Sequence, residues 1–183
     1  EFIELLNSGG VAVDFTGLRF AGGIGFEFLE GTVLAAGARL VLVRDGEAFN
    51  FRYPGVVVSG EYSGSLANGG ERILLVGNED EALVDFSYDE GGFWPAEADG
   101  DGFSLELEDE DGVPEYGVAS SWRRSLTVHG TPGSRGGFFG DPDADDDGDG
   151  QSAFGEYAFN TSDANAGENG TLIILSGAGD RAA

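Results

Sequence analysis

The sequence predicts an all-β chain, built as a sandwich or barrel of short strands. Three observations support this fold class. Apolar residues recur with a period of two, Gly-rich turn signals separate the apolar runs, and no window before residue 150 has a convincing helical period of 3.6. The length of 183 residues corresponds to about one domain and a remainder.

In chain order, the expected strands are 39–43, 72–76, 83–88 and 103–108. The first two are apolar on both faces, as central strands can be. The third alternates, and so does the fourth, which should bury Phe103, Leu105 and Leu107 and expose Ser104, Glu106 and Glu108. Phe26, Phe28, Phe49 and Phe51 are interpreted as core residues at period two. The intervening turn signals are 7–10, 45–46, 68–70, 77–80 and 99–102.

The composition excludes several classes of function. The net charge is -25, and all nine cations are Arg. A chain this acidic is repelled by phosphate backbones, so no nucleic-acid partner is expected. The absence of Cys excludes disulfides and thiolate chemistry, and a single His excludes a multi-His metal centre. The longest aliphatic stretches are a few residues, so no membrane insertion is expected.

The composition changes near residue 130 and divides the chain into three parts. We expect a compact β-domain at 1–133, a Gly/Asp-rich linker at 134–163, and a C-terminal segment at 164–183 with one strand at 171–176. A short amphipathic helix is expected around 154–158. The C-terminal strand either docks on the first domain or begins a truncated module.

The first part contains a series of short blocks in a fixed order: Phe2–Asn7, Val13–Leu18, Leu40–Val43, Leu66–Ile73, Val84–Tyr88, Trp94–Pro95, Ala98–Leu107, Ser121–Arg123 and Gly130–Gly133. This series resembles the lamin tail domain of bacterial extracellular proteins. The resemblance implies an immunoglobulin-like β-sandwich, usually an appended module and not a catalyst. The family's usual first strand, upstream of Phe2, is missing, which would leave a bare sheet edge. The strand at 171–176 is a candidate to fill it.

A calcium-loop pattern lies in the linker. The motif D-x-D-x-D-G-x5-E begins at Asp145 and matches the EF-hand-like spacing position for position. Alternate residues of a tight loop point to one centre, and Gly150 permits its sharp reversal. The predicted ligands of Ca²⁺ are Asp145, Asp147, Asp149, the Gln151 carbonyl and Glu156, with a water beside Ala153.

The same segment has two alternative interpretations. The acidic run could be a plain solvated linker, where Asp-x-Asp-x-Asp spacing arises easily by chance. A second register beginning at Asp143 fails because Phe154, which cannot ligate, falls at position 12. A complete EF-hand is excluded, since Gly136, Gly140 and Pro142 prevent a preceding helix.

Two other candidate sites favour structural interpretations. His129 has no nucleophile near it in sequence, so we expect a turn or surface His. Arg123 and Arg124 beside Trp122 could be a binding patch, but an Arg pair that meets neighbouring carboxylates while Trp122 covers the sandwich edge is the better interpretation.

These observations predict a non-catalytic extracellular or cell-surface structural or adhesion module. Ca²⁺ would neutralise clustered carboxylates and stiffen the junction to whatever follows. The protein or surface partner is not specified by the sequence. One alternative is an accessory domain of a secreted hydrolase or nuclease. Another is a filament subunit, a homo-oligomer in which residues 171–176 fill the bare edge of a neighbouring copy.

Overall fold

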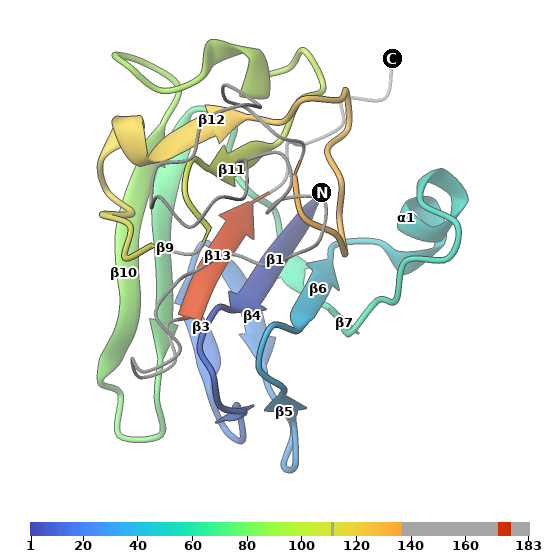
Figure 1. The fold of residues 1–183 in the computed structure, drawn as a ribbon, viewed down its shortest axis with the longest axis vertical. Coiled ribbons are helices and arrows are strands. Elements are labelled where there is room, and N and C mark those ends of the chain that lie inside the picture. The colour runs from blue at the N-terminus through green and yellow to red at the C-terminus, as the bar shows by residue number, and fades with distance from the viewer. Residues whose placement is uncertain (111, 137–171, 177–183) are drawn as a thin grey trace, which may run out of the picture.

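The part of the chain that the structure describes is mostly β, with several antiparallel sheets and one short helix. The computed structural model describes residues 1–110, 112–136 and 172–176 (Figure 1). Within these ranges, no helix is long and apolar enough to cross a membrane. The elements are β1 (Phe2–Asn7), β2 (Val13–Asp14), β3 (Arg19–Gly22), β4 (Ile24–Glu27), β5 (Val33–Leu34), β6 (Arg39–Val43), α1 (Gly46–Arg52), β7 (Gly60–Glu61), β8 (Ser63–Gly64), β9 (Gly70–Val76), β10 (Ala82–Asp89), β11 (Leu105–Leu107), β12 (Trp122–Arg124) and β13 (Leu172–Ser176), with 3₁₀ turns η1 (Ala96–Ala98) and η2 (Ala119–Ser121).

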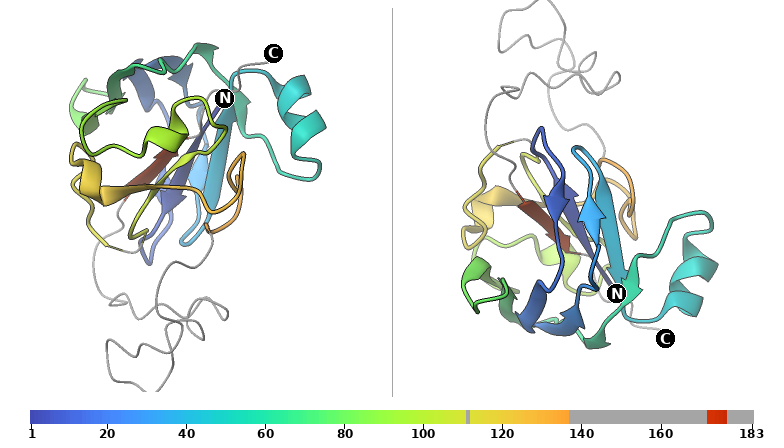
Figure 2. Two further views of the ribbon diagram at one scale, coloured as in Figure 1. Left: turned by 90° about the horizontal axis from the view of Figure 1, so that it is seen from above. Right: turned by 90° about the horizontal axis from the view of Figure 1, so that it is seen from below.

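The strands form two larger sheets and two small ones. One larger sheet has the order β13-β1-β6-β7, in which only the β6–β7 pair is parallel. The other has the order β10-β9-β3-β4-β8 and is antiparallel throughout. The small sheets are β11-β12 and β2-β5. Figure 2 shows β13, β1 and β6 side by side when the molecule is viewed from above or below.

One hydrophobic core is shared by the two larger sheets. Ile3 and Leu5 of β1 belong to the same buried cluster as Ile73 and Leu75 of β9. Trp122 of β12 joins this cluster as well. Burial of this apolar surface, at about 25 cal/mol per Å², is the main favourable contribution to the fold.

A smaller cluster lies on the other face of β1 and β6. It consists of Phe2, Val41, Val43 and Phe49, the last from α1. Apolar contacts on both faces explain why β6 is buried from Leu40 to Val43, as its sequence predicted. β1 is also buried along its whole length, although its Glu4 and Asn7 are buried by polar contacts and not by apolar ones.

The helix α1 corrects two sequence-based expectations. Asp45-Gly46 was expected to form a turn, but Asp45 is the N-cap of α1, and its side chain accepts a hydrogen bond from the Ala48 amide at 2.9 Å. Phe49 and Phe51 were expected to share a core at period two. Helical spacing instead buries Phe49 and leaves the Phe51 side chain 91% exposed.

The alternating strands give one confirmation and one correction. In β10, Val84 and Phe86 are buried while Asp85 is exposed, as predicted. At β11 and the residue before it, most of the expected solvent face is buried: Ser104 is 2% exposed and Glu106 is 5% exposed. Glu108 is exposed as predicted. The prediction was wrong for Ser104 and Glu106 because a later segment covers them, as described below.

The C-terminal strand β13 docks on the first part of the chain. Its antiparallel pairing with β1 runs from Ile3 opposite Ser176 to Asn7 opposite Leu172. Of the two arrangements that the sequence left open for this strand, docking is therefore the one that the structure has. β13 also lies alongside β11, so it occupies the strand position between β1 and β11.

Candidate functional site

The predicted calcium ligands lie outside the described residues. This applies to Asp145, Asp147, Asp149, Gln151 and Glu156, and also to the short helix expected after them. In the described ranges, no three or more His, Cys, Asp or Glu side chains are grouped to hold a metal ion. The calcium site therefore stays a prediction, and the candidate site that the structure does describe is a cluster of buried charges.

The first half of this cluster joins β1, β6 and the segment after β11. Glu4 and Arg39 stand on adjacent antiparallel strands, where Glu4 is opposite Val41 and hence diagonal to Arg39. Arg39 Nη1 donates to Glu4 Oε1 at 2.7 Å, and Arg39 Nη2 donates to Glu110 Oε2. Glu4 is 2% exposed and Glu110 is 5% exposed, so one guanidinium bonds two buried carboxylates and offsets the charge of one of them.

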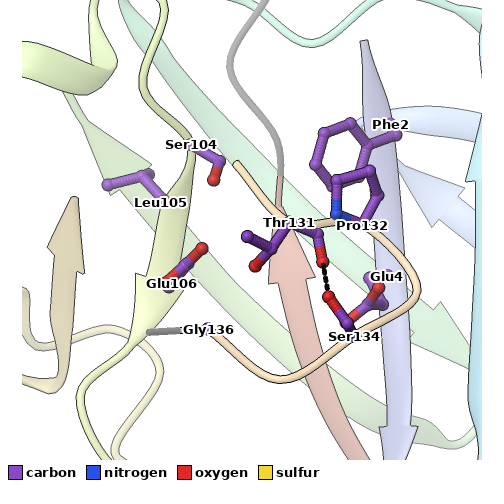
Figure 3. A pocket seen from close by; sticks show the side chains of 9 residues that line it. All are labelled: Phe2, Glu4, Ser104, Leu105, Glu106, Thr131, Pro132, Ser134 and Gly136. Atoms are coloured by element: carbon purple, nitrogen blue, oxygen red, sulfur yellow. Dashed lines mark hydrogen bonds between the residues drawn. The ribbon is translucent and has the colours of Figure 1, made fainter. Parts of the chain in front are cut away.

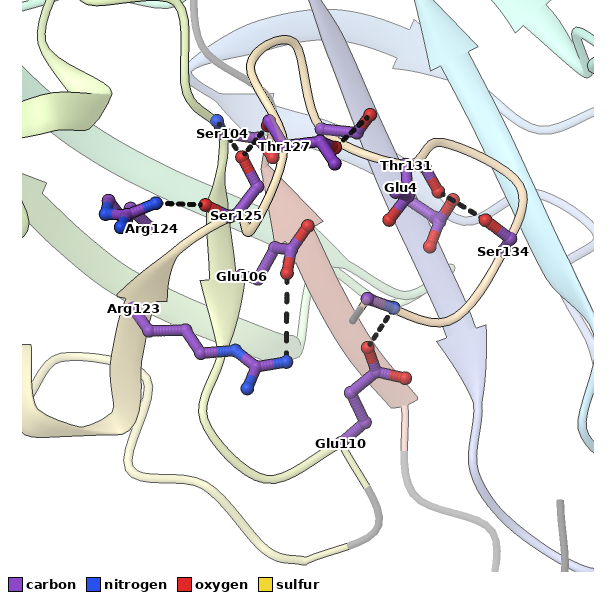
Figure 4. A network of polar contacts seen from close by, with 12 residues as sticks. Glu4, Ser104, Glu106, Glu110, Arg123, Arg124, Ser125, Thr127, Thr131 and Ser134 are labelled. Carbon is purple, nitrogen blue, oxygen red and sulfur yellow. Dashed lines mark hydrogen bonds and ion pairs between the residues drawn. The ribbon is translucent and has the colours of Figure 1, made fainter. Parts of the chain in front are cut away.

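The second half lies on β11 and β12. Glu106 and Arg123 are directly opposite each other in the antiparallel register. Arg123 Nη2 lies 3.8 Å from Glu106 Oε2, and both side chains are largely buried (Figure 4). We call Glu4, Arg39, Glu106, Glu110 and Arg123 the buried charge network. All five belong to residues 1–136.

The chain leaves β12 through a loop that covers this network. We call residues 131–136 the exit loop. The Gly133 amide donates to Glu4 Oε2, and the Gly136 amide donates to Glu110 Oε1 at 3.5 Å. Figure 3 shows the exit loop passing in front of β13, from the side of Ser104 to the side of Glu4. This loop is the segment that buries the second face of β11.

The space under the exit loop is small. A cavity of about 10 Å³ lies between Phe2 and Glu4 on one side and Ser104 and Glu106 on the other. That volume holds about one water molecule. This cavity therefore has room to solvate a carboxylate but not to admit an organic substrate. A separate, wider hollow of about 850 Å³ is lined by Arg39, Glu110 and residues 132–135 of the exit loop.

Burial changes the proton affinity of the network. Burial raises the pKa of Glu4 to about 6, although Arg39 and the Gly133 amide lower it. Burial likewise raises the pKa of Glu106, against the opposing effect of Arg123. For Arg39, burial favours the neutral form, but Glu110 and Glu4 together outweigh it and raise the pKa. Arg39 stays charged, and Glu4 is the member of this pair that titrates.

The remaining candidates take structural roles. His129 lies in a turn with φ of 79°, as expected, and its carbonyl accepts a hydrogen bond from the Tyr53 hydroxyl at 2.6 Å. The Arg pair meets carboxylates, as predicted: Arg124 lies 3.8 Å from Glu97, and Arg123 faces Glu106.

Trp122 is buried in the main core. It is 4% exposed and stacks against Phe86 with 5.5 Å between ring centroids. Its indole N–H donates to the Tyr116 carbonyl at 2.7 Å, so the one polar atom of the side chain is satisfied. Trp122 thus packs the β11–β12 pair against the main core.

The sequence contained a signal for the network that the alternation pattern obscured. Glu4 interrupts the otherwise apolar run Phe2–Leu6, and a lone charge in a strand buried on both faces needs a partner. Glu106 fits a solvent face equally well, so its burial had no local signal. The partners Arg39 and Glu110 lie far away in sequence, and no local pattern links them to Glu4.

Comparison of the chain with protein-family models, with curated proteins and with solved structures found no match. The resemblance to the lamin tail domain and the function that it implies therefore rest on the sequence blocks alone, and they are developed below as proposals.

Proposed function

We propose that this protein is a non-catalytic structural or adhesion module of the bacterial cell surface or extracellular space, with a Ca²⁺-dependent connection between its exit loop and β13. The observation that carries the proposal is the docking of β13 on β1. The segment with the calcium motif follows Gly136, which is bonded to Glu110, and ends at Leu172, which is paired with β1. Both ends are therefore held by residues 1–136, which we call the β-body. An ion bound in that segment would stiffen a closed connection.

The fold that we propose is an immunoglobulin-like β-sandwich. Support comes from the two larger sheets, which contribute to one shared core. Support also comes from the position of β13, which takes the place beside β1 that the resemblance assigns to a strand missing upstream of Phe2. A sandwich whose edge is filled has fewer unpaired backbone groups and a lower tendency to aggregate.

The state of the buried carboxylates favours a structural role over catalysis. Glu4 and Glu110 both bond Arg39, and both also accept a hydrogen bond from an amide of the exit loop. Glu106 faces Arg123. Carboxylates used in this way hold segments together, and the cavity between Glu4 and Glu106 has no room for a substrate.

Calcium is the ion that the linker motif fits. Three carboxylates, a carbonyl and a bidentate Glu156 form a shell of hard oxygen ligands. Extracellular modules of this kind bind with Kd of about 10⁻⁴–10⁻³ M, so millimolar Ca²⁺ outside the cell would fill the site. At ten times the Kd, binding to the folded state alone adds about 1.4 kcal/mol to the free energy of unfolding.

Calorimetric titration of the chelator-treated full chain with CaCl₂ tests this function. We expect one site per chain and slower proteolysis within 137–171 when Ca²⁺ is present. Glu156→Gln removes the carboxylate that is predicted to bind Ca²⁺ with both oxygens, so it should abolish the heat of Ca²⁺ binding. Asp143→Asn is the matched control, since it also removes one carboxylate charge from the linker but lies outside the motif. Equal heats from both variants, or no heat from the native chain, would overturn the calcium proposal.

A further inference from the structure

The position of β13 is a slot with two walls. On one side it pairs with β1 over five residues. On the other side it lies alongside β11, which is itself paired with β12 (Figure 3). A strand in this slot thus connects β1, β6 and β7 to the β11–β12 pair.

The walls of the slot are held by interactions that do not involve β13. Arg39 fixes Glu4 of β1 to Glu110, and Glu106 of β11 faces Arg123 of β12. The exit loop bridges the two walls through the Gly133 and Gly136 amides. Every one of these groups lies within residues 1–136, so these interactions use no residue of β13.

The strand that fills the slot comes from a distant part of the chain. Residues 137–171, a stretch of 35, separate Gly136 from the first residue of β13. The entropic cost of bringing β13 back to β1 of the same copy grows only slowly with the length of this connection. The connection is also long enough for β13 to reach β1 of a neighbouring copy. The ladder with β1 has the same backbone bonds whichever copy supplies the strand.

We propose that the slot between β1 and β11 is an acceptor for residues 172–176 of a second copy of this chain, so that two copies can form a dimer by exchanging β13. This inference deepens the proposed module by naming its partner, and it rests on the β-body of that proposal but not on calcium. Exchange of an identical element needs no new interface chemistry.

Charge and concentration set the balance between the closed monomer and the exchanged dimer. The chain has a net charge of -25, but Leu172–Ser176 carries no charge. Two bodies therefore repel each other while the exchanged strand does not, and added salt should favour the dimer. Since a tether gives an effective concentration of about 1 mM or less, exchange should become substantial as the chain concentration approaches that value.

Engineered disulfides distinguish the two arrangements, because the native chain has no Cys. Two double variants place Cys at register partners: Leu6→Cys with Ile173→Cys, and Ile3→Cys with Ser176→Cys. Opposite residues on antiparallel strands alternate between hydrogen-bonded and non-hydrogen-bonded pairs. Because positions 3 and 6 differ by an odd number, one of the two Cys pairs is of each kind, and at least one should have a Cα separation that suits a disulfide. The matched control, Leu6→Cys with Ser176→Cys, uses one position from each pair but is out of register.

Each variant is refolded with chelator at about 10 µM and at about 1 mM in high salt, oxidised, and analysed by non-reducing electrophoresis and mass spectrometry. We expect an internal disulfide in monomers at the low concentration, and a cross-linked dimer fraction at least about tenfold larger at the high one. Disulfides only within the chain at both concentrations would overturn the exchange. So would the absence of any cross-link in both in-register variants. Because chelator is present throughout, these failures are separate from failure of the calcium titration.

Discussion

Two ion pairs of the molecule have the same nitrogen–oxygen distance, but one pair is buried and the other is exposed to solvent. Arg39 and Glu4 are 2.7 Å apart, with side chains 12% and 2% exposed. Arg72 and Asp85, on β9 and β10, are also 2.7 Å apart, with side chains 58% and 41% exposed. The first pair is screened little by solvent, and removal of one partner leaves a buried charge; the second is screened by water and salt. Burial, and not distance, decides what each pair does for the fold.

The largest effect expected from this comparison is the loss of Arg39. Arg39→Met leaves both Glu4 and Glu110 without their guanidinium, and we expect the free energy of unfolding to fall by about 3–5 kcal/mol. Urea denaturation at neutral pH measures it. The triple variant Glu4→Gln, Arg39→Met, Glu110→Gln keeps acceptors for the exit-loop amides and removes the charges, so it should recover much of the loss. A triple variant as unstable as Arg39→Met would show that charge burial is not the cause.

The next effect is a pH dependence that belongs to the buried pair. The pKa of Glu4 is about 6 in the folded chain, against 4.5 for the ordinary side chain. The folded state therefore binds more protons than the unfolded state between these values, and the contribution of Glu4 to stability increases as the pH falls from 7 through 6 and levels off below 4.5. The difference of 1.5 in pKa corresponds to about 2 kcal/mol.

Glu4→Gln isolates this contribution from the general relief of charge repulsion in acid. Between pH 7.5 and 4.5, the free energy of unfolding of the native chain should rise by about 2 kcal/mol more than that of Glu4→Gln. Urea denaturation of both proteins across this range makes the comparison. Parallel curves would contradict the raised pKa. Asp85 is the contrasting case, because its hydrogen bond from Arg72 lowers its pKa. Between pH 7.5 and 4.5, the free energy of unfolding of the native chain should not rise more than that of Asp85→Asn.

The smallest effect is expected at the exposed pair. Arg72→Met makes the same substitution as Arg39→Met, but both partners remain solvated, so we expect no change beyond the error of a urea titration. Any small change should disappear in high salt. A loss comparable to that of Arg39→Met would remove the distinction between the two regions.

The sequence predicted the parts of this fold that depend on local pattern. The alternation in β10 and the doubly buried β6 follow from a period of two and an aliphatic run, and both are present. The helix α1 was missed because seven residues are too short for a helical period to stand out, and because Asp45-Gly46 equally suits a turn. A cap and a turn use the same residues.

Apart from the lone charge of Glu4 in an apolar run, the buried charge network depends on information that no local pattern contains. Glu106 is buried only because residues 131–136 return across β11, and Glu4 is tolerated only because Arg39 lies on the adjacent strand. The strand at 172–176 was predicted from its apolar run, whereas its position between β1 and β11 follows from the tertiary fold. The predicted calcium ligands lie outside the described residues, and the titration above tests them.

The central claim is that β13 fills the strand position beside β1, and amide hydrogen exchange tests it most directly. In the native chain, the amides of Phe2–Asn7 should be protected on both sides, by β6 and by β13. Ile174→Pro removes a backbone donor in the middle of β13 and should release β13 from the ladder. The β1 amides that face β13 should then exchange much faster, while those bonded to β6 stay protected. Ala178→Pro, placed beyond the strand, is the matched control and should leave the exchange of β1 unchanged. Identical protection of β1 in the native chain and in Ile174→Pro would contradict the account.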